Sequence, residues 1–255
     1  LLVTAVLRLS FRSSSRTLEM ILYNWMGIGF VFFCLCFIYE LLRIGTILND
    51  YWAGVGILIV GACITIFALA TAQRLSCKQL EFRDPRLTRK YRLVQISDVH
   101  IGSRSVGFLR RVVEVINTQN PNLIVITGDF LDAKRVQAED IAPLKNLKAP
   151  VYFSIGNHER YAGLDWVIPM LEDAGVVVLR SQAVKVGELQ LIGIDDAEDE
   201  DQVRRELSTI ELDPECFKIL LYHRPLGWES AVASGINLML SGHTHNGQIF
   251  PFNLL

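Results

Sequence analysis

Two long runs of residues without a charged side chain lie near the start of the chain. The first extends from Met20 to Tyr39, and the second extends from Tyr51 to Gln73. Each is long enough to cross about 30 Å of hydrocarbon as a helix, which rises about 1.5 Å per residue. A segment inside lipid must satisfy its own backbone hydrogen bonds, so a helix is the expected structure. We predict membrane helices over residues 20–42, where the first run continues past Glu40, and over residues 51–73, joined as a hairpin.

Two buried core helices are the alternative explanation for these runs. Aromatic residues stand near the ends of both runs, where interfacial side chains are enriched in membrane proteins; they are Trp25, Tyr39, Tyr51 and Trp52. The hydrophobic fraction of 51% is also high for a purely soluble protein. A cleaved signal peptide is disfavoured, because the first run is too long and no small-residue cleavage site follows it. These features favour the membrane hairpin.

Basic residues flank the hairpin at its two outer ends. They are Arg8, Arg12 and Arg16 before it and Arg74, Lys78, Arg83, Arg86, Arg89 and Lys90 after it, whereas the loop between the runs carries Arg43 and Asp50. Positive flanks favour the cytoplasmic side, so we predict a multi-pass protein of the cell membrane with both outer ends in the cytoplasm. Residues 1–19 are predicted as a basic juxtamembrane segment that includes, at residues 1–7, the stub of an earlier helix. Residues 74–90 are predicted as a basic linker, and a solvated linker is favoured over one that contacts anionic lipid headgroups.

From residue 91 onward, short apolar runs alternate with segments of helical periodicity. The pattern predicts strands at 93–96, 123–126, 151–155, 176–179, 183–186, 189–194, 218–222 and 236–240, and helices at 108–117, 138–147, 164–174 and 200–207. The strands on either side of Gly187-Glu188 are predicted to form a hairpin. Strands that alternate with helices indicate an α/β domain with largely parallel pairing. Polar residues at the carboxyl ends of such strands mark the usual functional edge of the sheet.

Every histidine of the chain stands just beyond a predicted strand. The five are His100, His158, His223, His243 and His245. Neutral imidazole is the commonest protein ligand for a transition metal. His243 and His245 are two residues apart in an extended segment, which places both rings on one side of it. Because all five histidines stand at strand ends, we expect them to belong to one common metal-binding site.

Oxygen ligands occupy the same kind of position. Asp98 lies two residues before His100, Asp129 follows a strand and Gly128, and Asn157 offers a neutral carbonyl oxygen. The predicted ligands are Asp98, His100, Asp129, Asn157, His223, His243 and His245. This set is too large for one transition ion but suits two ions that share the Asp129 carboxylate. Two ions about 3.5–4 Å apart activate a bridging hydroxide for in-line phosphoryl displacement, and His158 is left free to protonate the leaving group.

Each of these pieces also has an ordinary explanation. An Asp-x-His pair arises by chance, Gly128-Asp129 can be a simple turn, and Asn157 and His158 can cap a helix. His223 can be a core histidine with satisfied hydrogen bonds. For these explanations to be correct, every one of the motifs would have to be accidental, although each stands at a predicted strand end. Short motifs become specific when their structural context agrees with them. The context therefore favours a two-metal site.

The motifs resemble, in order, the signature of the calcineurin-like metallophosphoesterases. They are Asp98-x-His100, Gly128-Asp129, Gly156-Asn157-His158-Glu159, His223 and Gly242-His243-Thr244-His245. The longer segments 96–102 and 242–249, together with the hairpin, resemble the membrane-anchored branch of that superfamily. The resemblance covers residues 91–255 and implies an α/β fold, a four-layer αββα sandwich of two sheets flanked by helices.

The resemblance also implies a division of the ligands between two divalent transition ions, Mn²⁺, Fe²⁺ or Zn²⁺. One ion would be held by Asp98, His100, Asp129 and His245, and the other by Asp129, Asn157, His223 and His243. His158 is implied as the general acid. Asp132 matches a family aspartate and is expected to orient His158.

Two departures from the family pattern limit what the resemblance implies. The protein-phosphatase motif Gly-Asp-x-x-Asp-Arg-Gly is replaced here by a segment that ends in Ala133 and Lys134, without the phosphate-binding arginine and the final glycine. A protein serine/threonine phosphatase is therefore not expected. The chain also ends at Leu255, where the family's domain continues, so we expect a domain that is incomplete at its C-terminus.

We expect a membrane-anchored hydrolase of phosphate mono- or diesters. The alternative is a catalytically inactive, membrane-tethered protein that binds metal or a partner, and the complete ligand set favours the enzyme. A lipid-linked phosphate is the substrate expected first, because a membrane tether raises the effective concentration of the domain at the bilayer; a soluble nucleotide or phosphodiester is the rival. A net charge of −2 gives no reason to expect nucleic-acid binding. For Asp195-Asp196, a solvated acidic loop is favoured over a role in the site.

Overall fold

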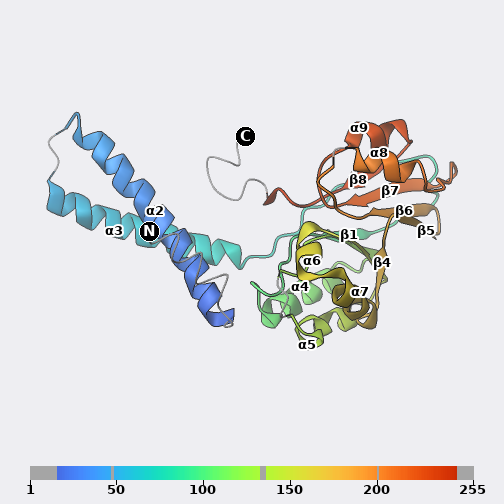
Figure 1. Cartoon of the computed structure of the whole chain (residues 1–255), viewed down its shortest axis with the longest axis horizontal. Coiled ribbons are helices and arrows are strands. Elements are labelled where there is room, and N and C mark those ends of the chain that lie inside the picture. The colour runs from blue at the N-terminus through green and yellow to red at the C-terminus, as the bar shows by residue number, and fades with distance from the viewer. Residues whose placement is uncertain (1–15, 47–48, 133–135, 200, 246–255) are drawn as a thin grey trace. The chain divides into compact units, whose positions relative to one another are not determined.

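The computed structural model describes residues 16–46, 49–132, 136–199 and 201–245. The chain divides into two compact units, Leu1–Cys77 and Lys78–Leu255 (Figure 1). The predicted helix stub at residues 1–7, the segment that departs from the protein-phosphatase motif at 133–134, and the end of the chain from residue 246 lie outside the described residues.

The first unit contains two long helices, α2 (Arg16–Arg43) and α3 (Asp50–Ala72), which pack against each other. Within them, Asn24–Arg43 and Asp50–Ala72 are long and apolar enough to cross a bilayer. A β-carbon added to Gly61 of α3 would lie 2.5 Å from Cε1 of Phe32, so this glycine permits the close approach of α2. Small residues serve helix packing in lipid in this way. The predicted hairpin of two apolar helices is confirmed.

The second unit contains two four-stranded sheets. The first sheet has the order β1-β2-β3-β4, with all neighbours parallel; its strands are β1 (Leu93–Ile96), β2 (Leu123–Thr127), β3 (Val151–Ser154) and β4 (Val176–Leu179). The second has the order β5-β6-β7-β8, with strands β5 (Gln182–Val186), β6 (Leu189–Ile194), β7 (Phe217–Tyr222) and β8 (Leu238–Leu240). β5 and β6 form the predicted antiparallel hairpin, and the other neighbours in this sheet are parallel.

Helices cover the outer faces of the sheets. The described helices of this unit are α4 (Val106–Thr118), α5 (Ala138–Ile141), the 3₁₀ helix η1 (Ala142–Asn146), α6 (Asn157–Ala162), α7 (Leu164–Asp173), α8 (Gln202–Leu207) and α9 (Trp228–Ala233). The predicted helix at 138–147 is divided in two at Ala142, next to Pro143, which provides no backbone N–H for a continuous α-helix. α6 and α9 were not predicted, because six residues are too few to establish a helical period.

Side chains alternate between two apolar layers along each strand. In β2, Leu123 and Val125 pack between the two sheets, while Ile124 and Ile126 pack in the cluster that includes α4 and α7. In β7, Leu221 packs between the sheets and Leu220 packs in the cluster that includes α8 and α9. Figure 1 shows α8 and α9 on one side of the paired sheets and α4, α5 and α7 on the other. The predicted α/β fold, a four-layer αββα sandwich, is confirmed.

The segment that contains Arg86 and Thr88, which precedes β1 in the sequence, is hydrogen-bonded to the sandwich. Arg86 donates a hydrogen bond to the backbone oxygen of Cys216, and Thr88 bonds the Glu188 carboxylate through both its backbone N–H and its hydroxyl. Cys216 and Glu188 each immediately precede a strand, β7 and β6 respectively. The part of the predicted linker from Arg86 onward thus lies against the amino-terminal ends of these strands.

Candidate metal centre

The predicted site residues follow the carboxyl ends of parallel strands. Asp98 and His100 follow β1, Asp129 and Asp132 follow β2, Asn157 and His158 follow β3, His223 follows β7, and His243 and His245 follow β8. Parallel neighbours end at the same edge of a sheet, and the paired sheets bring their two edges together. All of the predicted ligands and both predicted catalytic residues therefore lie at one edge of the sandwich.

The backbone at this edge is strained at five of the candidate ligands. Asp98, His100, Asp129, His243 and His245 have φ between 48° and 72°, a region that residues with a β-carbon rarely adopt. Among the described residues, the other non-glycine positions with positive φ are Asn120 and Ser181. Strain of this kind clusters at functional sites, where contacts with the surrounding structure offset its energetic cost and hold the side chain in an unusual position. The sharp turns direct side chains from separate loops toward one another.

Gly242 allows the loops after β8 and β1 to approach. A β-carbon added to Gly242 would lie 1.8 Å from Oγ of Ser97 and 2.3 Å from Oδ2 of Asp98. The next residue, His243, donates its backbone N–H to both carboxylate oxygens of Asp98 at 3.1 Å. Residues about 145 positions apart in the sequence are thereby brought into contact.

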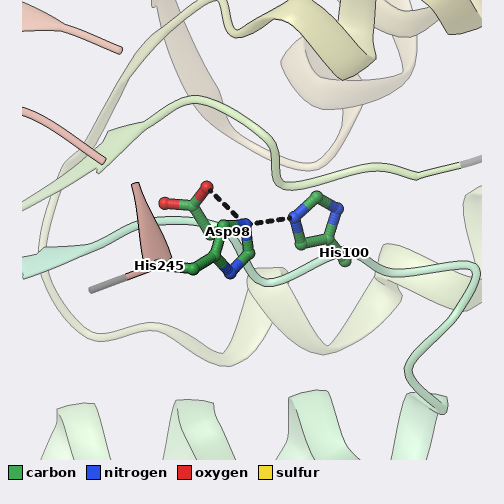
Figure 2. Close-up of side chains that lie close together, drawn as sticks. All are labelled: Asp98, His100 and His245. Atoms are coloured by element: carbon green, nitrogen blue, oxygen red, sulfur yellow. Dashed lines mark hydrogen bonds and ion pairs between the residues drawn. The ribbon is translucent and has the colours of Figure 1, made fainter. Parts of the chain in front are cut away.

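Asp98, His100 and His245 form the first candidate metal-binding group (Figure 2). Nε2 of His245 lies 3.2 Å from Oδ1 of Asp98 and 3.3 Å from Nε2 of His100. The two imidazole rings are stacked, with an interplanar angle of 18°. Two ring nitrogens and a carboxylate oxygen thus converge on one small region.

Asp129, His223 and His243 form the second group. Nε2 of His223 lies 3.1 Å from Oδ2 of Asp129 and 3.1 Å from Nδ1 of His243. Nδ1 of His223 lies 2.8 Å from the backbone oxygen of Thr127, which can only accept a hydrogen bond. In neutral His223 the proton is therefore on Nδ1, and the lone pair of Nε2 faces Asp129 and His243.

The net effect of burial and neighbouring groups is to lower the pKa values of Asp129 and His243 and to raise that of His223, where burial opposes the rise and the Asp129 carboxylate causes it. Burial alone would raise the pKa of Asp129, but a hydrogen bond from His223, when that ring is protonated at both nitrogens, and one from the backbone N–H of His158 hold it below its usual range. Burial and the adjacent His223 lower the pKa of His243, which favours its neutral, metal-binding form.

The donor atoms have the spacing that a bound transition ion requires. Ligands about 2.0–2.1 Å from one ion are separated from their neighbours by about 2.8–3.0 Å in octahedral geometry and about 3.3–3.4 Å in tetrahedral geometry. Two separations in each group are 3.1–3.3 Å, close to these values, and all donor atoms of a group lie within 4.8 Å of one another. Oδ1 of Asn157 is also buried and has no hydrogen-bond partner among the described residues, as expected of an oxygen kept for a cation. The residues present therefore fit divalent ions.

Asp132 lies against both His158 and the candidate ligand His100, whose Nδ1 is 3.3 Å from Oδ1 of Asp132. Nδ1 of His158 lies 2.7 Å from Oδ1 of Asp132, while Nε2 lies 3.9 Å from Oδ2 of Asp129. The hydrogen bond with Asp132 raises the pKa of His158, although burial opposes this. Burial acts against ionisation of Asp132, but hydrogen bonds with His100, His158 and Ser103 hold its pKa far below the usual range. His158, with His100 and Asp129, also forms a third group close enough to hold an ion.

Glu159 supports the turn that carries Asp129, a role that the sequence reading did not assign. Its side chain is fully buried, and its carboxylate accepts the backbone N–H groups of Asp129, Phe130, Leu131 and Gly156 at 2.8–3.0 Å. Burial and the nearby Asp129 charge raise the pKa of Glu159, while these donors oppose the rise. A glutamate three residues after Gly156, where α6 begins, was the available signal, since such residues bond backbone N–H groups at helix starts.

Asp195 and Asp196 are not part of a solvated acidic loop, so that expectation is wrong. Both are buried, and arginines bind both: Arg180 lies 2.7 Å from Asp195, and Arg224 lies 2.7 Å from Asp196. The acidic residues that follow them in the sequence suggested solvation, but the arginines come from distant segments. The backbone N–H of Asp196 also bonds the oxygen of Ile155 at 3.1 Å, which places the pair next to the loop that carries Asn157.

Comparison with known proteins identifies the region that contains the site. The family model of the calcineurin-like phosphoesterases matches residues 91–247. An uncharacterized metallophosphoesterase of Campylobacter jejuni, Cj0846, is 30% identical over 70% of this chain and 50% of its own length. A protein of Danio rerio named transmembrane protein with metallophosphoesterase domain is 32% identical over 78% of this chain and 51% of its own length. The chain spans about half the length of these relatives.

A solved structure, that of phosphopantetheinyl hydrolase (PptH) from Mycobacterium tuberculosis, also resembles the chain. The TM-score is 0.42 at 15% identity, over 60% of this chain and 83% of that chain. A similarity at this level supports no conclusion about function.

Proposed function

Because this chain belongs to the calcineurin-like phosphoesterase family, as its motifs indicated, we propose that it hydrolyses phosphate mono- or diesters. One observation carries the proposal. Residues from the loops after β1, β2, β7 and β8 form linked groups of nitrogen and oxygen donors spaced for metal ions.

The proposed site holds two divalent transition ions, Mn²⁺, Fe²⁺ or Zn²⁺. Asp98, His100 and His245 hold one ion, Asn157, His223 and His243 hold the other, and Asp129 is shared. When bound, the ions supply an activated water and stabilise the charge of the phosphoryl oxygens. Oδ1 of Asp129 accepts the backbone N–H of His158 at 2.9 Å, which leaves Oδ2 directed toward His223.

His158 is the proposed general acid. Asp132 holds Nδ1, so Nε2 is the nitrogen that faces the candidate ligands and can give its proton to the leaving oxygen. This pair also bears on the rival proposal of an inactive metal-binding protein. Metal binding alone does not require an additional histidine oriented by a partly buried aspartate, whereas protonation of a leaving group does.

We further propose that the protein is anchored in the cell membrane with its catalytic unit in the cytoplasm. Two apolar helices of sufficient length and transmembrane relatives support the anchor, and the basic flanks support the orientation. A lipid-linked phosphate is the proposed substrate, because the tether concentrates the site at the bilayer.

Hydrolysis by the purified full chain tests the catalytic proposal. With Mn²⁺ in detergent, the chain should hydrolyse an aryl phosphate monoester or diester, and Asp129→Asn should not. The proposal fails if the folded chain hydrolyses neither ester with any divalent transition metal.

The lipid proposal is tested in vesicles that contain the full chain. A lipid phosphate placed in the same vesicles should be hydrolysed at least about tenfold faster than the same lipid in separate vesicles, because the tether acts only within one bilayer. Equal rates would favour the rival, a soluble nucleotide or phosphodiester.

A further inference from the structure

An exposed tyrosine lies against the proposed general acid. Tyr161 follows His158 by three residues on α6, a spacing that places two side chains on the same helix face. The ring centroids are 5.7 Å apart with an interplanar angle of 61°, an edge contact. Tyr161 nevertheless remains 61% exposed. Much of its ring surface is thus open to solvent beside the acid.

The orientation of His158 determines what can occupy the space near this ring. Asp132 holds Nδ1, so the leaving oxygen must lie within hydrogen-bond reach of Nε2. The rest of the leaving group extends from that oxygen away from the phosphoryl group. Two rings are in edge contact with His158: His100, a candidate ligand, and Tyr161, which is 61% exposed. Tyr161 is therefore the aromatic neighbour of the acid that is open to a leaving group.

The helix that carries Tyr161 is fixed at several points. Asp129 accepts the backbone N–H of His158, and Nη2 of Arg160 lies 3.6 Å from Oδ2 of the buried Asp195. The backbone N–H of Gly163, the residue after the end of α6, bonds the oxygen of Glu159 at 2.9 Å. Tyr161 therefore projects from a short, well-anchored helix. A rigid aromatic side chain loses little conformational freedom when a ligand covers it.

We propose that Tyr161 forms a binding subsite for the leaving group and selects substrates whose leaving group carries a flat aromatic ring, which for a lipid-linked diester requires that the lipid remain on the phosphoryl group. This inference rests on the proposed function, since it takes His158 as the acid that faces the leaving group. An aromatic face stacks on another flat ring with a preference beyond the area covered, and such stacking tolerates many ring types. An alkyl chain or a saturated ring gains only from the covered area.

Binding of two non-hydrolysable ligands to the full chain with Mn²⁺ tests the subsite. Phenylphosphonate and cyclohexylphosphonate share the anionic group and have similar size, and they differ in the flat ring. Titration calorimetry gives the dissociation constant of each ligand. Tyr161→Ala should raise that of phenylphosphonate roughly tenfold and that of cyclohexylphosphonate less than about twofold. Tyr161→Phe should keep the wild-type preference. Trp228→Ala, which removes another exposed aromatic side chain of the same unit, should change neither affinity.

The outcomes separate this inference from the proposed function. An equal loss for both phosphonates in Tyr161→Ala, or no loss for either, would overturn the aromatic subsite. Hydrolysis of phenyl phosphate by the wild-type chain reports the function independently of that ratio. If the aromatic preference is present without hydrolysis, the subsite stands as a binding site and the catalytic proposal fails.

Discussion

Five candidate ligands adopt a left-handed backbone conformation, which costs about 1–3 kcal/mol at each residue with a β-carbon. The surrounding contacts compensate for this strain at two of the turns. Glu159 accepts the N–H groups of the turn at Asp129, and Asp98 accepts the N–H of His243. In both cases a carboxylate is the acceptor, and such charge-assisted bonds are stronger than neutral ones.

At this scale, the sequence predicted which residues come together but not how. Asp129 and His223 were identifiable because each follows an apolar strand, and parallel strands end at a common edge. The backbone strain could not be foreseen, because neither aspartate nor histidine in a sequence specifies a positive φ. The role of Glu159 was also missed, since its partners include Phe130 and Leu131, about thirty residues away.

Removing the proposed acid should slow catalysis without emptying the site. In His158→Ala we expect turnover to fall about 10²–10⁴-fold, because proton transfer to the leaving group is lost while the ligands in the proposed assignment are unchanged. The loss should be much smaller for a substrate whose leaving group needs no proton. Turnover of esters with good and poor leaving groups, together with the metal content, measures this. Loss of a metal in His158→Ala would show that His158 is a ligand.

Replacing the buried Glu159 should destabilise the second unit. Glu159→Gln places an amide NH₂ among backbone N–H donors and leaves buried groups unsatisfied, which we expect to cost about 2–4 kcal/mol. Glu114→Gln changes an exposed glutamate of α4 and should cost less than about 0.5 kcal/mol. Denaturant unfolding followed by intrinsic fluorescence compares the two variants. Equal stability would show that the Glu159 carboxylate does not hold the turn.

At the scale of elements, long periodic segments were predictable and short ones were not. α4 has buried residues at Leu109, Val112, Val113 and Ile116, the spacing from which its helix was predicted. α6 and α9 have six residues each, and α6 begins within the metal-ligand motif itself. Tertiary contacts rather than local periodicity stabilise such short helices.

The contact between Gly61 and Phe32 should control packing of the hairpin. Gly61→Ile places a branched side chain where even a β-carbon would overlap Phe32, so we expect a loss of about 1–3 kcal/mol in helix association. Gly54→Ile is the matched control, because a β-carbon there meets nothing within 4 Å. Thermal unfolding in detergent, followed by circular dichroism, measures both. A loss of equal size in the two variants would contradict packing at Gly61.

At the scale of the whole chain, hydropathy separated the two parts, because the first consists mainly of long runs without charge and the second alternates short apolar strands with helices. Runs without charge can satisfy their backbone only as helices in lipid, whereas the alternating pattern after residue 91 requires partners on both faces of each sheet. The resulting units, Leu1–Cys77 and Lys78–Leu255, combine an apolar hairpin with the family's catalytic fold. The hydropathy pattern could not predict the hydrogen bonds that attach Arg86 and Thr88 to the sandwich, because their partners lie 100 or more residues away in the sequence.

The proposed catalysis depends on a pair of metal ions that share Asp129, and the metal content of the purified full chain measures whether that pair is present. Elemental analysis by plasma mass spectrometry after removal of free Mn²⁺ should find two ions per wild-type chain. Asp129→Asn should hold fewer than one, because both ions lose a charged ligand. Asp173→Asn, an exposed change in α7, should hold two. One ion or none in the wild-type chain, with the same content in Asp129→Asn, would contradict the shared two-metal centre.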